Sequence, residues 1–362
     1  MERKSLIGLP FAELMRYFKA YDLTAMQARQ TWEWMYRHGV RYFKDMTNLS
    51  LSVRKQLEQV YSCERLPVQY NKTSTDGTQK WLFRLENTEN SADDTTFEAI
   101  ETVFIPEETR ATICLSSQVG CALQCRFCRT GTQGYTRNLT LYEIVAQVLS
   151  VKDAIDDWPK DPLTHRLKNI VFMGMGEPLL NYEALKKVLE IFMDPHGLAF
   201  SRHRITVSTS GITPMLERLA RECRVPLALS LHASSEALRS DLMPINEHYP
   251  LKDLMQAVRM YPALSGTDKV TIEYALLKGI NDSPADARAL LSLLRGIPAK
   301  VNLLTLNPWE GAPFTPSSPQ IYATFSRILT QGGIDCFRRR SRGQDILAAC
   351  GQLRANKVYS TS

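Results

Sequence analysis

Residues 111–128 read ATICLSSQVGCALQCRFC. The first five residues are mostly apolar or β-prone and predict a buried strand. Three cysteines follow on one short loop, Cys121, Cys125 and Cys128, with the spacing Cys-x3-Cys-x2-Cys. Three such thiolates can hold three corners of a cubic iron–sulfur cluster and leave the fourth iron without a protein ligand. Because an open iron can bind a small molecule directly, the spacing predicts a catalytic cluster.

A zinc site and a disulfide framework both fit these clustered cysteines less well. A zinc site usually has four ligands in two pairs, and no second pair follows this loop. A disulfide framework needs an oxidising compartment, but the charged start of the chain leads into no apolar signal core. No apolar run reaches the length of a membrane span. We therefore expect a cytoplasmic protein with no membrane attachment.

Strand and helix patterns alternate from residue 111 onward. The strand patterns cover residues 111–115, 169–172, 204–208, 227–231, 269–276 and 300–306. The helical patterns cover 141–154, 182–193, 214–223, 251–261, 285–296 and 320–331. Six such units predict an α/β fold with a parallel sheet and right-handed crossovers. A closed eight-unit barrel takes about 250 residues, so six units predict a partial (β/α)6 barrel.

The chain before residue 107 has a different character. Helical patterns at 11–21, 25–38 and 50–61 predict a small helical module. Strand patterns at 68–70, 80–85 and 97–104 follow, with Asp76-Gly77 as a hairpin turn and an acidic loop at 86–96. We therefore divide the chain into a helical module (1–64), a β-rich segment (65–106), the barrel (107–341) and a C-terminal tail (342–362).

Positive charge is concentrated at the two ends of the chain. The net charge is +6 in total, with +4 over residues 1–60, −5 over residues 61–110 and +5 over residues 311–362. Two basic ends suit a polyanionic partner such as RNA. A solvated basic face accounts for the same charge equally well.

Polar or small residues follow most of the predicted parallel strands. The cysteine loop follows the first strand, GMGEP (174–178) the second, STSG (208–211) the third, SLH (230–232) the fourth and Asn307-Pro308 the sixth. Ligand sites in parallel sheets lie beyond the carboxyl ends of the strands. We therefore expect these segments to meet in one site.

Four segments together resemble the RlmN family of radical SAM methyltransferases, which act on 23S ribosomal RNA and tRNA. They are SSQVGC (116–121), GMGEP (174–178), LMPIN (242–246) and AACGQL (348–353), and the resemblance runs nearly end to end. Phe127 supplies the aromatic residue of the radical SAM signature Cys-x3-Cys-x-aromatic-Cys. The resemblance implies a 4Fe–4S cluster on Cys121, Cys125 and Cys128, with S-adenosylmethionine as the second cofactor.

The resemblance also implies a reaction in several steps. One S-adenosylmethionine methylates Cys350, and a second yields a radical that removes a hydrogen from this methyl group. The resulting methylene radical adds to carbon 2 of an adenine, a carbon too electrophilic for polar methyl transfer. Glu101 then removes the carbon 2 proton, and Cys114 displaces Cys350 through a transient disulfide. Taken alone, Cys114 would be a core residue of its strand and Cys350 an idle thiol.

The cofactor pocket implied by the resemblance consists of Gly176, Glu177, Ser208, Ser230, Leu231, His232 and Asn307. Glu177 would accept from the ammonium group of the methionine part, and glycines let the backbone approach the ligand. Without the resemblance, His232 would be a structural histidine and Asn307-Pro308 a simple turn. Candidates for RNA phosphate contacts are Arg126, Arg129, Arg137, Arg338, Arg339, Arg340 and Arg342.

Two competing functions are open at this point. A Cfr-like enzyme would methylate carbon 8 of the same rRNA adenosine, but residues 118–123 (QVGCAL) resemble RlmN, whereas Cfr-type sequences carry Cys-Gly-Cys-Asn there. A non-enzymatic iron–sulfur or zinc RNA-binding regulator would not cleave S-adenosylmethionine. For partners, the resemblance implies 23S rRNA and tRNA, an electron donor such as flavodoxin or ferredoxin, and a monomeric enzyme. Cys63, Cys223 and Cys336 match no motif and are expected to be structural.

Overall fold

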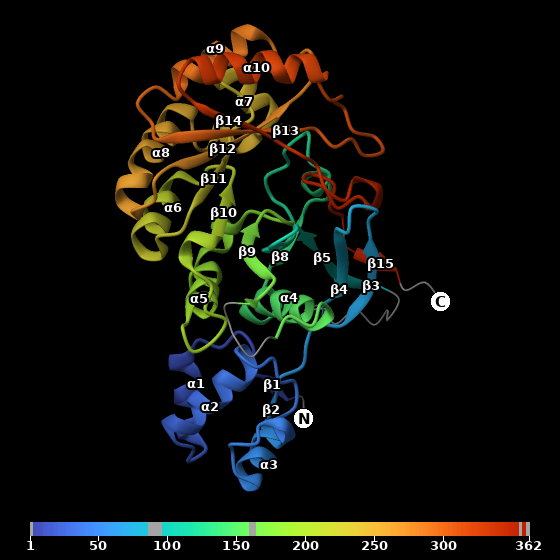
Figure 1. The fold of residues 1–362 in the computed structure, drawn as a ribbon, viewed down its shortest axis with the longest axis vertical. Helices are drawn as coiled ribbons and strands as arrows, with labels where there is room; N and C mark the ends of the chain where they lie inside the picture. The colour runs from blue at the N-terminus through green and yellow to red at the C-terminus, as the bar shows by residue number, and fades with distance from the viewer. Residues whose placement is uncertain (1–2, 86–95, 159–163, 355–356, 360–362) are drawn as a thin grey trace.

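The computed structural model describes residues 3–85, 96–158, 164–354 and 357–359. Its centre is a row of parallel strands with helices packed on one side (Figure 1). In spatial order they are β6 (Ala111–Cys114), β9 (Leu167–Phe172), β10 (Ile205–Thr209), β11 (Leu227–Ser230), β12 (Val270–Leu276), β13 (Ala299–Thr305) and β14 (Asp335–Arg339). All neighbours in this row pair in parallel. The predicted partial α/β barrel is therefore confirmed.

The helices between these strands follow the predicted pattern. They are α4 (Leu141–Ala154), α5 (Tyr182–Met193), α6 (Thr213–Arg218) with its π-helical continuation Leu219–Cys223, α8 (Leu251–Ser265), α9 (Pro284–Leu293) and α10 (Pro319–Gln331). Capping boxes start two of them, at Thr140 with Glu143 and at Ser283 with Asp286. A short helix, α7 (Glu236–Leu242), and the strand β14 were not predicted. The alternating apolar residues of a core strand are missing from β14, which has the sequence DCFRR.

The β-rich segment extends the same sheet instead of forming one of its own. β3 (Val68–Thr73), β4 (Gln79–Arg84) and β5 (Thr96–Pro106) pair antiparallel, and β5 pairs with β6 of the barrel. Gly77, with φ +80°, allows the turn between β3 and β4. The short strand β15 (Lys357–Tyr359) also pairs with β5. Residues 86–95 of the predicted acidic loop lie outside the described residues.

The N-terminal module packs below the barrel, next to α4 and α5 (Figure 1). It contains α1 (Phe11–Ala20), α2 (Ala25–Tyr36) and α3 (Leu51–Val60), and β1 (Lys4–Ser5) pairs with β2 (Tyr61–Ser62). Arg65 ties the module to the barrel, since its guanidinium donates to Asp153 at 2.8 Å and to the Gly39 carbonyl at 2.9 Å. Among the described residues, no helix has both the length and the apolar composition that crossing a membrane requires.

Candidate active site

A cavity opens at the carboxyl ends of the parallel strands, where the strand-end residues were expected to meet. Most of the residues singled out in the sequence line this main cavity: Cys121, Cys125, Cys128, Gly176, Glu177, Ser208, Ser230, His232, Asn307 and Cys350. They come from the cysteine loop, from the ends of several strands and from the C-terminal segment, which we define as residues 343–354. The fold therefore gathers side chains that are far apart in the sequence.

The three clustered cysteines lie on the loop between β7 (Gln118–Gly120) and β8 (Tyr135–Asn138). Burial raises the pKa of the Cys121 thiol to about 12 and that of Cys125 well above its usual value. Thiols with a raised pKa need a bound metal to stabilise the thiolate. Within the described residues, no three His, Cys, Asp or Glu side chains are arranged to hold one metal ion. The three thiols thus lie on one short loop that borders the main cavity.

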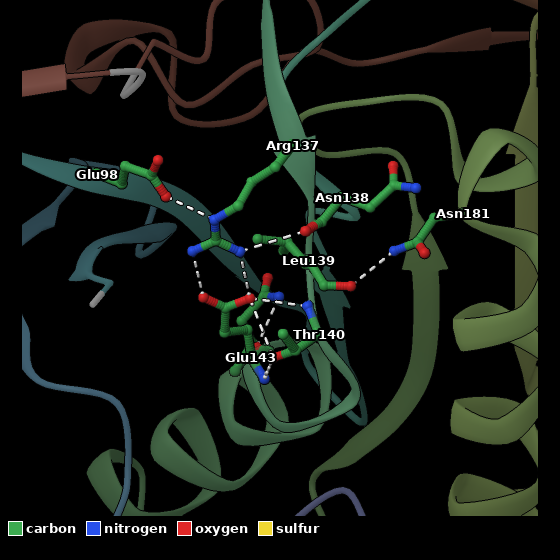
Figure 2. A network of polar contacts seen from close by, with 8 residues as sticks. Glu98, Arg137, Asn138, Leu139, Thr140, Glu143 and Asn181 are labelled. Atoms are coloured by element: carbon green, nitrogen blue, oxygen red, sulfur yellow. Dashed lines mark hydrogen bonds and ion pairs between the residues drawn. The ribbon is translucent and has the colours of Figure 1, made fainter. Parts of the chain in front are cut away.

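Arg137 braces the end of this loop (Figure 2). Its guanidinium donates through Nε to Glu98 at 2.7 Å, and through Nη1 and Nη2 to the two carboxylate oxygens of Glu143 at 2.8 and 2.7 Å. The side chain is only 16% exposed. Both of its terminal nitrogens and Nε are committed to carboxylates, so the expectation that Arg137 contacts RNA phosphates is wrong. Its role is to fix β8 against the start of α4 and against β5.

Arg137→Ala should lower the free energy of unfolding by about 3 kcal/mol, because it removes a guanidinium that pairs with two nearly buried carboxylates. Urea titration followed by circular dichroism measures this loss. Arg218→Ala is the matched control: Arg218 also pairs with two carboxylates, Glu183 and Glu222, but is 40% exposed. Its replacement should have a much smaller effect. Equal losses in the two variants would contradict a bracing role.

Glu177 presents a buried carboxylate to the main cavity. Its oxygens accept from the backbone N–H groups of Ser210 at 2.8 Å and Leu179 at 3.0 Å. Burial nevertheless raises its pKa to about 7. A carboxylate that has lost most of its water gains from a cationic ligand, so this wall of the cavity suits an ammonium group.

His232 faces the cavity in a defined protonation state. Its Nδ1 accepts from the Ala275 N–H at 3.0 Å, which leaves Nε2 as the donor. Burial lowers its pKa to about 3, so the ring is neutral at physiological pH. The ring lies edge-on to Phe127, with centroids 4.7 Å apart. The Nδ1 atom of His232 therefore has a structural hydrogen-bond partner, and Nε2 is available to a ligand in the cavity.

Leu231 and Asn307 were both expected to contact the cofactor, but their side chains are placed differently from the other pocket residues. The Leu231 side chain is fully buried and is not among those that line the cavity, although its backbone lies between Ser230 and His232, which are. The Asn307 amide reaches the cavity but is bound to the C-terminal segment: its Nδ2 donates to the Cys350 carbonyl at 3.2 Å, and its Oδ1 accepts from Gln344 at 2.7 Å. Any contact of Leu231 with a ligand must come from its backbone.

Cys114 and Cys350 meet in a smaller side cavity next to the main one. Both line it, and Cys350 lines the main cavity as well. Burial and then the neighbouring Cys350 raise the pKa of the Cys114 thiol to about 12. Cys350 itself is exposed. The fold thus brings together a strand thiol and a tail thiol that have no relation in sequence.

Glu101 lies beside these cavities without lining either. Its Oε1 is 2.7 Å from Lys80 Nζ, and its Oε2 accepts from the Arg354 N–H at 2.8 Å. Leu353, the residue before Arg354, lines both cavities. The C-terminal segment therefore separates the Glu101 carboxylate from the open space.

Two charged residues line the site although neither was assigned to it from the sequence, where Arg339 was instead a candidate for RNA phosphate contacts. Glu273 on β12 lines the main cavity; its Oε1 accepts from Asn302 at 3.0 Å, and its buried Oε2 has no hydrogen-bond partner among the described residues. Arg339 on β14 lines both cavities and lies near both Cys114 and Cys350. The signal for Glu273 was present in the sequence, as an acidic residue inside the apolar run VTIEYAL.

Comparison with known families agrees with this geometry. The family model described as the radical SAM superfamily matches residues 115–291. The one described as the ribosomal RNA large subunit methyltransferase N-terminal domain matches residues 4–63. Together they span the helical module, the cysteine loop and most of the barrel.

Individual relatives extend the similarity to nearly the whole chain. The dual-specificity RNA methyltransferase RlmN of Granulibacter bethesdensis is 46% identical over 97% of this chain and 87% of its own length. The protein of the same name from Rhodopseudomonas palustris is 46% identical over 98% and 90%. A crystal structure of a radical SAM methyltransferase from Sphaerobacter thermophilus, 42% identical, superposes with a TM-score of 0.88 over 97% of this chain and 99% of that one. The chain therefore belongs to the RlmN family of the radical SAM superfamily.

Proposed function

We propose that this protein methylates carbon 2 of an adenosine in 23S ribosomal RNA, and of the adenosine 3′ to the anticodon in some tRNAs. The observation that carries the proposal is the meeting of Cys114 and Cys350 beside the cysteine loop, in a chain that matches RlmN proteins almost end to end. An enzyme that only cleaves S-adenosylmethionine needs the cysteine loop alone. The two additional thiols fit methyl transfer through cysteine.

The cofactors are a 4Fe–4S cluster and S-adenosylmethionine, which supply a 5′-deoxyadenosyl radical when bound. We assign Cys121, Cys125 and Cys128 as the cluster ligands. Their position on the wall of the main cavity and the match of residues 115–291 to the radical SAM superfamily support this assignment. Glu177 would hold the ammonium group of the methionine part, and Gly176, Ser208, Ser230, His232, Asn307 and the Leu231 backbone would hold the rest.

Three residues would take part in transferring the methyl group to the RNA. Cys350 would hold it as S-methylcysteine, since this thiol is exposed and borders both cavities. Glu101 would accept the carbon 2 proton. Cys114 would attack the Cys350 sulfur, form a disulfide and release the product. The proximity of the two thiols supports the last assignment.

The partners follow from this chemistry. The substrate adenine must leave its stack to reach the cavity, as in other enzymes that act on a base. We propose that the helical module (1–64) contributes to RNA binding and that the tail (342–362) acts as the methyl carrier. A one-electron donor of the flavodoxin or ferredoxin type would supply the reducing electron, and the enzyme would act as a monomer in the reducing cytoplasm.

The test is the identity of the methylated base. We expect RNA incubated with the reconstituted enzyme, S-adenosylmethionine and reductant to yield 2-methyladenosine by mass spectrometry against both isomer standards. The relatives at 46% identity support carbon 2 over the Cfr-like alternative. Recovery of 8-methyladenosine would overturn the choice of carbon. Absence of 5′-deoxyadenosine would instead favour the non-enzymatic regulator.

A further inference from the structure

We infer that Lys80 is a positioning residue for the reaction. Its buried ammonium binds both Glu101 and the C-terminal segment and so fixes the position of one relative to the other. The inference rests on the proposed function, in which Glu101 accepts the carbon 2 proton. Lys80 belongs to the antiparallel extension of the sheet, and no sequence motif connects it with the barrel chemistry. Its contacts make that connection.

Lys80 and Glu101 are diagonal neighbours on adjacent strands. Lys80 of β4 lies opposite Val103 of β5, and Glu101 lies opposite Leu82, so the two side chains are on one face of the sheet. Lys80 Nζ is 2.7 Å from Glu101 Oε1, and the side chains are 7% and 2% exposed. Because both strands belong to the continuous sheet, this contact does not depend on the C-terminal segment.

The same ammonium also binds the C-terminal segment. Lys80 Nζ donates to the Leu347 carbonyl at 3.1 Å. Leu347 has φ +54°, in the left-handed region that is unfavourable for a residue with a Cβ. A strained backbone persists where surrounding contacts hold it. Here one of these contacts is the buried Lys80 ammonium, which binds the chain at Leu347, three residues before Cys350. Lys80 therefore fixes the segment close to the proposed methyl carrier.

Stability alone does not account for a buried pair at this position. Removing two charges from water costs more than their attraction returns in many proteins, and apolar residues of similar volume are often as stable. Leu82, the neighbour of Lys80 on the same face of its strand, is buried and apolar. Retention of an ion pair fits a task that needs the charge.

The contacts of Glu101 also distinguish its two oxygens. Oε1 faces Lys80 Nζ from β4 and, at 3.5 Å, the Tyr70 hydroxyl from β3. Oε2 faces the Arg354 N–H from the C-terminal segment. When that segment moves to admit an adenine, Oε2 loses its partner while Oε1 keeps Lys80. We therefore assign Oε2 as the acceptor: the carbon 2–hydrogen bond breaks, an O–H bond forms on Oε2, and the electron pair stays with the adenine.

The experiment compares Lys80→Met and Lys80→Arg with the wild-type enzyme. Methylation of Cys350 and formation of 5′-deoxyadenosine should persist in both variants, because neither step uses Glu101 and the C-terminal segment keeps its contacts at Asp345 and Gln352. In Lys80→Met the covalent RNA adduct should persist, with product release slowed about a hundredfold, the usual scale of a general-base contribution. Lys80→Arg should recover most of the rate, since it keeps the charge.

The arginine variant and a neighbouring lysine separate this role from a purely structural one. Arginine restores the cation beside Glu101 but not the shape of lysine, so it should rescue a defect that comes from the lost charge and should not rescue a packing defect. Lys72→Met is the matched control, because Lys72 lies directly opposite Lys80 on β3 but is exposed. It should behave as wild type.

Two results would overturn the inference. One is product release by Lys80→Met at the wild-type rate; the other is a defect that arginine does not rescue. Intact Cys350 methylation in the same samples shows that the variants are folded. Failure of the proposed function looks different, since the wild-type enzyme itself would then form no 2-methyladenosine.

Discussion

Cys125→Ala should abolish cleavage of S-adenosylmethionine, with 5′-deoxyadenosine at background level after anaerobic reconstitution. Cys125 is the middle ligand of the proposed cluster and lines the main cavity. Removing it leaves one iron without a thiolate and opens the cluster to water. Iron and sulfide content should fall with it, as should the electron paramagnetic resonance signal of the reduced cluster.

Cys223→Ala is the control for this experiment. Cys223 is as buried as Cys125, at 7% against 8% exposure, but lies in the π-helical turn after α6 and does not line the cavity. This variant should keep its cluster and its activity. A fully loaded, active Cys125→Ala enzyme would refute the ligand assignment. Stoichiometric zinc in the wild-type protein would point to the regulator instead.

Cys114→Ala should trap the RNA on the protein. The methylene bridge from Cys350 to carbon 2 would form as usual, but no thiol would then displace Cys350. We expect a covalent adduct that approaches one RNA per active enzyme and almost no released product. A denaturing gel with labelled RNA measures the adduct, and it should disappear in the double variant with Cys350→Ala.

Cys336→Ala is the matched control for the trap, because this half-buried thiol on β14 does not line either cavity. It should release product normally. In the wild type, release should speed up with pH, since the attacking species is a thiolate and burial raises the pKa of Cys114. Free product at normal yield from Cys114→Ala would contradict the resolving role.

The barrel is predictable from the sequence because its strands before β14 carry buried apolar residues at alternating or successive positions, between segments with helical patterns. The strand β14 is not, because its charged residues resemble a loop. Nor does the sequence show that β3 to β5 continue the barrel sheet, because pairing between distant strands leaves no local signal. That pairing places Glu101 and Lys80 next to the C-terminal segment.

The part of the site that is predictable from the sequence consists of the residues at the carboxyl ends of the parallel strands. The rule that ligands bind at the carboxyl ends brings Gly176, Glu177, Ser208 and Ser230 together without coordinates. The pairing of Cys114 with Cys350 came only from the family resemblance, since nothing in the residues themselves links a core strand to the tail. The commitment of Arg137 to two carboxylates required the coordinates, because each partner comes from a different element.

The Asn307 amide has a thermodynamic consequence. Both of its polar atoms are engaged by the C-terminal segment, so a ligand that needs this amide competes with the segment for it. Competition of this kind is reciprocal. The factor by which the docked segment lowers the affinity for the ligand equals the factor by which the bound ligand weakens docking of the segment. Ligand binding in the cofactor pocket and release of the C-terminal segment are thus thermodynamically coupled, and a measurement of either one reports on the other.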